Sequence, residues 1–247
     1  ENSNLNTNNL PIKSFFPLHH ALFCKNTLLS KQLMTSKNIN ELDENGMSPL
    51  YIACTTGNEE MVKELLQKNA RVDFKLTFLK SKLKTLVDVA SANGFLSIVE
   101  SLLHHGVKAS TYILFDTINR EYTEIIKVFL ENQIELLDAK DNNGDTPLIE
   151  ACYLGNLDIV KLILSKLDQQ DKLYRLNQTK QIPSSKEEML KYHNIVHSKN
   201  KEGITATMVA TAHCHYFILK ELLTFNPQLV HESSITSSSL LHFLLYY

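Results

Sequence analysis

The sequence has few of the residues that mark disulfide-rich, membrane-spanning or strongly charged proteins. Four cysteines and no CxxC pair in 247 residues argue against a disulfide framework and favour a reducing compartment. A net charge of -2 at pH 7 gives the chain as a whole no attraction to nucleic acid or anionic membranes. No run approaches the roughly 18 apolar residues of a membrane-spanning helix. With 43% hydrophobic residues, the composition predicts a soluble globular protein.

The two ends of the sequence differ in composition. Residues 1–14 begin with ENSNLNTNN, an asparagine-rich stretch that predicts a disordered linker. Residues 237–247, SSSLLHFLLYY, stop inside an apolar helical pattern. We therefore expect a fragment whose natural chain continues past Tyr247.

One sequence pattern occurs several times along the chain. The stretches NGMSPLYIACTTGNEEMVKELL at 45–66 and NGDTPLIEACYLGNLDIVKLIL at 143–164 share Asn-Gly, Ser/Thr-Pro-Leu, Ala-Cys and Gly-Asn. Weaker copies begin at Pro17, Thr85, Tyr112 and Gly203, and LLHFLLYY begins a further one. The pattern resembles the ankyrin repeat, whose Thr-Pro-Leu-His-x-Ala core recurs about every 33 residues. The residues at its alanine position are Ala21, Ala53, Ala90, Thr117, Ala151, Ala210 and Leu244.

The close copies also predict helix boundaries on physical grounds. Ser48 and Thr146 precede a proline and are suited to cap the start of a first helix, which Gly57 and Gly155 would end. The apolar residues that follow are spaced to form one face of a second helix. Together with Asn-Gly turns, these signals predict an all-α solenoid of helix-turn-helix units with short β-hairpin fingers over residues 15–247.

The repeat pattern is irregular at two places. The fourth copy lacks the Gly-x-Thr-Pro segment, since only VKAS separates Gly106 from its first helix, so one finger should be missing. An insertion at about 168–198 separates the fifth and sixth copies, and Ser185 and Glu188 have capping-box spacing for a short extra helix. This insertion is either part of a binding face or a tolerated surface loop.

The finger region of the third copy is basic. KLTFLKSKLK at 75–84 carries Lys75, Lys80, Lys82 and Lys84 and no acidic residue. A projecting cluster of this charge could contact an acidic partner or anionic lipid headgroups, or it could be a solvated hairpin. Nucleic acid is not expected, because the patch is short and Phe78 is its one aromatic residue.

The cysteines and histidines that might carry chemistry have simpler structural explanations. Cys54 and Cys152 follow the repeat alanine, where a small buried residue belongs. His20 and Cys24 could share a helix face, but a zinc site needs more ligands. HCH at 213–215 puts Cys214 at the helix-ending glycine position. The resemblance gives His19 and His242 a structural role in ordering the fingers. We expect neither a metal nor a cofactor.

The resemblance implies a monomeric interaction module, not an enzyme, that binds a protein partner through finger tips and inner helices. The residues at these positions are Glu44, Asn45, Met47, Thr55 and Thr56 in the second copy, Asn142, Asn143, Asp145, Tyr153 and Leu154 in the fifth, and Lys201, Glu202, Ile204, Ala212 and His213 in the sixth. The alternative is a substrate-recognition region of a larger enzyme whose catalytic domain lies elsewhere. The residue usage also resembles ankyrin-containing effectors of intracellular bacteria, and a protist or other eukaryotic scaffold is comparable. We expect a cytoplasmic location, which would be the host cell cytoplasm for a bacterial effector.

Overall fold

The computed structural model describes residues 16–73, 83, 85–179 and 194–232. The predicted linker at 1–14, the lysines at 75–84, the capping box at 185–188 and the copy at 240–247 lie outside them. The chain forms two compact units, Glu1–Val107 and Lys108–Tyr247. The boundary coincides with the fourth copy, whose finger the sequence lacks. The described residues are helical and contain no β-strand, so the predicted fingers are tight turns instead of paired strands.

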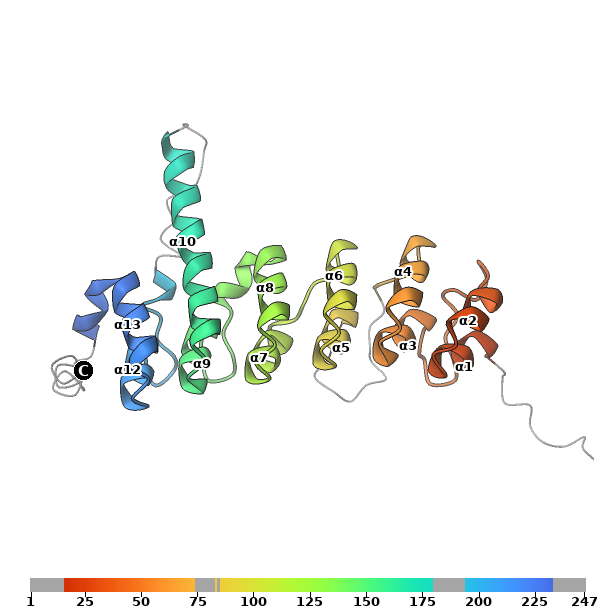
Figure 1. The fold of residues 1–247 in the computed structure, drawn as a ribbon, viewed down its shortest axis with the longest axis horizontal. Helices are drawn as coiled ribbons and strands as arrows, with labels where there is room; N and C mark the ends of the chain where they lie inside the picture. Colours follow the sequence, from red (N-terminus) through yellow and green to blue (C-terminus); the bar gives the residue numbers. More distant parts are fainter. Residues whose placement is uncertain (1–15, 74–82, 84, 180–193, 233–247) are drawn as a thin grey trace, which may run out of the picture. The chain divides into compact units, whose positions relative to one another are not determined.

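The first unit contains three helix pairs in its described residues. Their first helices are α1 (Pro17–Phe23), α3 (Pro49–Thr56) and α5 (Leu86–Ala92), and their second helices are α2 (Thr27–Leu33), α4 (Glu59–Gln67) and α6 (Leu96–His104). Each first helix packs on the next first helix, and each second helix on the next second helix (Figure 1). This two-row stack confirms the predicted solenoid arrangement within the unit.

The second unit has the same arrangement. Its first helices are α7 (Thr111–Asn119), α9 (Pro147–Leu154) and α12 (Ala206–Ala212), and its second helices are α8 (Thr123–Asn132), α10 (Leu157–Thr179) and α13 (Tyr216–Phe225). Two short 3-10 helices follow α8 and α13, at Ile134–Asp138 and Pro227–Glu232. Helix α9 contacts both α7 and α12, so it lies at the centre of the row of first helices.

A serine or threonine hydroxyl caps the N-terminus of most first helices. In five of the six described pairs a serine or threonine oxygen accepts a hydrogen bond from the backbone N–H three residues later. These caps are Ser48, Thr85, Ser110, Thr146 and Thr205. Ser48 and Thr146 confirm the sequence-based prediction. Thr85 forms a full capping box with Asp88, which compensates for the proline that this copy lacks.

The residue that ends each first helix adopts a left-handed conformation. Gly57 and Gly155, which the sequence predicts to end their helices, have φ angles of 72° and 71°. Gly94 has the same conformation, and three pairs place a non-glycine residue there. These are Lys25, Glu121 and Cys214, with φ angles of 53°, 58° and 56°. A side chain in this region costs roughly 1 kcal/mol, so these three copies retain the turn at some cost in stability.

The apolar faces predicted for the second helices are buried. They consist of Met61, Val62, Leu65 and Leu66 in α4 and Ile159, Val160, Ile163 and Leu164 in α10. Cys54 and Cys152 are fully buried in α3 and α9, which confirms that they are packing residues. Each unit therefore has its own apolar core between its two rows of helices.

Helix α10 is longer than the sequence pattern predicts. The expected second helix covers Ile159–Leu164, whereas α10 continues to Thr179 and includes the start of the insertion. No glycine or proline stops it, and the i,i+4 ion pairs Asp168–Lys172 and Asp171–Arg175 support the added turns. Figure 1 shows α10 rising above the neighbouring helices of its unit. Leu173 and Leu176 in this projecting part are 50% and 48% exposed.

Candidate functional site

Three tight turns precede first helices and have the same construction. In the second unit the Asp141 Oδ1 accepts hydrogen bonds from the backbone N–H groups of Asn143 and Asp145, both at 2.8 Å. Asp43 and Asn200 close the turns at 43–47 and 200–204 in the same way. In each turn one side-chain oxygen accepts from two backbone N–H groups and holds the turn closed. The side chains at the tip of the turn point outward. The exposed tip residues are Glu44, Asn45, Asn142, Asn143, Lys201 and Glu202.

The two turns of the second unit are hydrogen-bonded to each other. The backbone N–H of Lys201 donates to the Asn143 carbonyl at 3.0 Å, and its Nζ donates to the Asn142 carbonyl at 2.7 Å. A Cβ on Gly144 would lie 3.1 Å from the Lys201 nitrogen, so this approach favours glycine at that position. The turn tips of α9 and α12 therefore form one surface.

Asp145 is not at that surface, and its predicted exposure is wrong. The residue is 4% exposed, and its Oδ1 accepts a hydrogen bond from Asn200 Nδ2 at 2.8 Å. Sequence position alone suggested a tip residue, but the neighbouring turn covers it. Met47 and Ile204 were also predicted to be at turn tips, but both are half-buried, because each lies at the base of its turn.

His19 orders a turn from below. Its Nε2 lies 3.0 Å from the Glu41 carbonyl and 3.1 Å from the Met47 carbonyl. Both partners are acceptors, so Nε2 carries a proton and donates to them. This arrangement confirms the structural role that the ankyrin resemblance implied for His19, whereas His242 lies outside the described residues.

An aromatic group occupies the exposed side of α9 and α12. The Tyr153 ring packs edge-on against the His213 ring with centroids 5.7 Å apart, and His213 stacks on His215 at 5.8 Å. A Cβ on Gly155 would meet His215 Cε1 at 2.6 Å, so the glycine also makes room for this ring. Leu154 is 39% exposed beside the group. The predicted residues Tyr153, which is half-buried, and His213 are thus brought together, and Leu154 follows Tyr153 in α9.

Carboxylates surround this group. Burial raises the pKa of the Tyr153 hydroxyl, and the charges of Asp145, Glu202 and Glu150 raise it further. Half-burial also raises the pKa of the Glu150 carboxyl, with a smaller opposing effect from a hydrogen bond of Asn119 and an upward effect from Asp145 and Asp141. The surface is therefore apolar and aromatic at its centre and negatively charged around it.

The corresponding positions of the first unit are less open. Thr55 and Thr56 are half-buried, and their hydroxyls donate to the Ile52 carbonyl at 2.9 Å and 2.8 Å. The hydroxyls of Thr55 and Thr56 are therefore already used within α3 and are less available to a partner. The largest exposed apolar side chain on a first helix here is Phe23, 52% exposed at the end of α1.

Reasoning from sequence missed two residues of the first-helix faces. Glu150 lies three residues before Tyr153 on α9, a spacing that puts both on one face and could have drawn attention to it. Tyr112, at the start of α7, is 39% exposed. It was overlooked because the fourth copy has no finger from which to count positions.

The cysteine and histidine pairs form no metal site among the described residues, where no group of three or more His, Cys, Asp or Glu could hold an ion. Cys24 Sγ and His20 Nδ1 are 3.9 Å apart on the exposed side of α1. Burial raises the pKa of the Cys54 and Cys152 thiols, which disfavours the reactive thiolate. Cys214 occupies the predicted glycine position at the end of α12.

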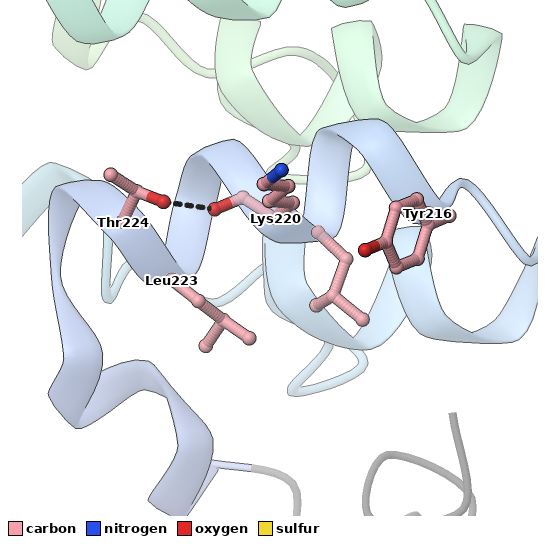
Figure 2. A pocket seen from close by; sticks show the side chains of 5 residues that line it. Tyr216, Lys220, Leu223 and Thr224 are labelled. Atoms are coloured by element: carbon pink, nitrogen blue, oxygen red, sulfur yellow. Dashed lines mark hydrogen bonds between the residues drawn. The ribbon is translucent and has the colours of Figure 1, made fainter. Parts of the chain in front are cut away.

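Helix α13 borders a cavity of about 230 Å³. Figure 2 shows the side chains that line it. It is lined by Tyr216, Leu219, Lys220, Leu223 and Thr224, and the Thr224 hydroxyl donates to the Lys220 carbonyl at 2.8 Å. The lining residues supply no carboxylate, imidazole or thiol. A second hollow of about 270 Å³ between α10 and α13 contains the Lys161–Glu221 ion pair, 3.5 Å long. Ser165 and Thr224 line this second hollow together with Asp168 and Glu221. Their hydroxyls donate to the Leu162 and Lys220 carbonyls at 2.8 Å and not to a carboxylate.

Comparison with known proteins agrees with this architecture. The family model described as ankyrin repeats (3 copies) matches residues 1–77, 18–111 and 86–173. The chain belongs to the ankyrin-repeat family. The α12–α13 pair lies beyond the matched residues, but it has a threonine cap and a left-handed turn like those of the α9–α10 pair.

Several curated proteins share this sequence pattern. The chain is 34% identical over 104 residues to alpha-latroinsectotoxin-Lt1a of Latrodectus tredecimguttatus, and 28% identical over 169 residues to ankyrin repeat protein nuc-2 of Neurospora crassa. These alignments cover 38% and 63% of the chain but 7% and 16% of the two relatives. The match with a probable 26S proteasome regulatory subunit p28 of Saccharomyces cerevisiae, 24% identical, covers 61% of the chain and 69% of that protein.

Solved structures share the fold at low sequence identity. The ankyrin repeat domain of Bcl-3 aligns with a TM-score of 0.62 and 17% identity, over 87% of each chain. An ankyrin repeat domain from Acinetobacter baumannii aligns with a TM-score of 0.61 and 22% identity, over 85% of this chain and 97% of that one. None of the helices in the described part of the chain is long and apolar enough to cross a membrane.

Proposed function

We propose that this ankyrin-repeat region is a protein-interaction module that binds a partner protein through the first-helix and turn-tip surface of its second unit. The observation that carries this proposal is the exposed Leu154 beside the Tyr153–His213 ring pair, next to the joined turns at 142–143 and 201–202. Buried aromatic anchors such as tyrosine contribute much of the binding energy at many interfaces, and the surrounding contacts exclude water from them. The exposed turn tips of the first unit, Glu44 and Asn45, are a secondary contact region.

Affinity capture with matched variants tests the proposal. The full chain is immobilised, and retained proteins from a cell lysate are compared among wild type, Tyr153→Ala, Leu154→Ala and Leu173→Ala. Leu173 is the control, because it is also an exposed leucine and lies on the projecting part of α10. We expect partner affinity to fall about 5- to 30-fold in Tyr153→Ala and Leu154→Ala, an interface loss of roughly 1–2 kcal/mol.

Circular dichroism spectra and thermal midpoints show whether the variants are folded. Because Tyr153 is half-buried, its replacement should lower stability slightly, whereas Leu154→Ala should leave it unchanged. The proposal fails if capture is the same for wild type and Leu154→Ala but is lost in Leu173→Ala. Capture that falls only in proportion to stability would make Tyr153 a packing residue.

The related proposal of substrate recognition for a larger enzyme uses the same surface. The two proposals predict different results in one respect. If the region recognises a substrate, the full-length protein would chemically modify the retained protein. We further propose a reducing, cytoplasmic location, which is supported by the four free cysteines. The placement in a host cell and the effector role stay predictions.

A further inference from the structure

The acidic residues near Tyr153 differ from those on the second helices of the same unit. On the second helices, Glu124, Glu131, Asp168 and Glu221 each form an ion pair with a lysine. Glu150 and Glu202 form no ion pair within the part of the chain that the structure describes. These four carboxylates of the second helices are therefore neutralised, whereas Glu150 and Glu202 near Tyr153 are not. The neighbouring Lys201 donates its Nζ to the Asn142 carbonyl at 2.7 Å.

Glu150 is stronger evidence for a missing cation than Glu202, because Glu150 is half-buried and Glu202 is exposed. Removing a carboxylate from water costs free energy unless a cation or several hydrogen bonds replace the water. Asn119 supplies one hydrogen bond, and the charges of Asp145 and Asp141, which also act on this carboxyl, are negative. A cation from outside the chain would compensate this carboxylate.

The neighbouring groups indicate the shape of that cation. Glu150 and Tyr153 lie three residues apart on α9 and so share a face, with His213 of α12 against the tyrosine ring. A planar guanidinium can stack on aromatic rings and bond to a carboxylate with two N–H groups, which an ammonium cannot match. Leu154 offers an apolar contact beside them.

We infer that the α9–α12 surface binds a partner segment in which an arginine lies next to an aliphatic residue. The guanidinium contacts the Glu150 carboxylate and the Tyr153 ring, Glu202 adds long-range attraction, and the aliphatic side chain packs on Leu154. The inference rests on the proposed interaction function and specifies the chemistry of the partner. An acidic segment or a nucleic acid would be repelled at this surface.

Two dipeptides that differ in one charge test the inference. Isotope-labelled full chain is titrated with acetyl-Leu-Arg-amide and with acetyl-Leu-citrulline-amide, which has the same shape without the charge, and backbone amide shifts are followed by NMR. We expect saturable shifts at residues 149–155, 202 and 213 with the arginine peptide. The citrulline peptide should bind at least about fivefold more weakly, and added salt should reduce the difference.

Matched variants assign the effect to one carboxylate. Glu150→Gln should bring arginine-peptide binding to the citrulline level, whereas Glu124→Gln, which removes the same charge from α8, should change it less than twofold. Equal binding of the two dipeptides, or full arginine selectivity in Glu150→Gln, would overturn the inference.

The same variants separate this inference from the function on which it rests. If captured partners are lost in Leu154→Ala but kept in Glu150→Gln, the interaction function stands and the arginine inference is wrong. If no protein is retained by the wild type while the dipeptide binds as expected, the interaction function fails and the surface is an arginine-binding site of another purpose.

Discussion

Single residues in the turns between helices limit the stability of some repeats. Cys214 has a left-handed φ of 56° at a position that the other repeats of the unit fill with Gly155 or Glu121. We expect Cys214→Gly to raise the free energy of unfolding by about 0.5–1 kcal/mol, because glycine removes the strain at a small entropic cost. Urea denaturation followed by circular dichroism measures the change.

The control for this prediction is Ala212→Gly. Ala212 is also exposed but lies in the last turn of α12, where glycine should lower stability by up to about 1 kcal/mol. Loss of stability in both variants would mean that Cys214 makes a contact worth more than the strain of its backbone.

Glu150 should reduce stability at neutral pH. Its pKa is raised in the folded state, so the folded chain binds this proton more tightly than the unfolded chain does. Above the folded pKa the ionised group opposes folding, and below the ordinary carboxyl pKa this effect disappears. We therefore expect Glu150→Gln to raise the thermal midpoint slightly at pH 7, with the gain fading on acidification towards pH 4. A gain that persists or grows in acid would contradict this.

At the scale of the elements, the short helices follow closely from local sequence. The caps Ser48 and Thr146 and the stops Gly57 and Gly155 could be read directly, because capping chemistry depends on neighbours within four residues. The end of α10 could not be predicted from the sequence. Beyond Leu164 the sequence of α10 has neither a helix-breaking residue nor the apolar spacing of a buried helix face. The strong first-helix cap at Thr85 was also missed, because that copy lacks the expected Thr-Pro pair.

The projecting part of α10 should be dispensable for the fold. Lys172→Pro would break the helix within the segment that contains the exposed Leu173 and Leu176. We expect lower helix content by circular dichroism, with a thermal midpoint within about 2–3 °C of wild type, since little core is lost. Lys161→Pro is the control and should unfold the unit, because α10 is packed against α8 and α13 there. Similar losses in both variants would show that the projection supports the core.

At the scale of the whole molecule, the two compact units should respond separately to core damage. Leu65 is fully buried in α4 of the first unit, so Leu65→Ala should cost about 2–5 kcal/mol there. We expect faster amide hydrogen exchange in the helices between 16 and 107 and unchanged exchange in α9 and α10. Ile163→Ala in α10 should give the reverse pattern. Equal acceleration in both units would show a single cooperative fold.

The repeat, the helix pairs and the buried positions of Cys54 and Cys152 follow from the order of the amino acids, because they depend on spacing and local chemistry. Tertiary structure decided which of the remaining residues are available. It buried Asp145 under Asn200 and brought Tyr153 and His213 together from residues 60 apart in the chain. It also left Glu150 without an ion-pair partner among the residues that the structure describes. Such neighbours depend on how one repeat stacks on the next, and no pattern within a single repeat contains that information.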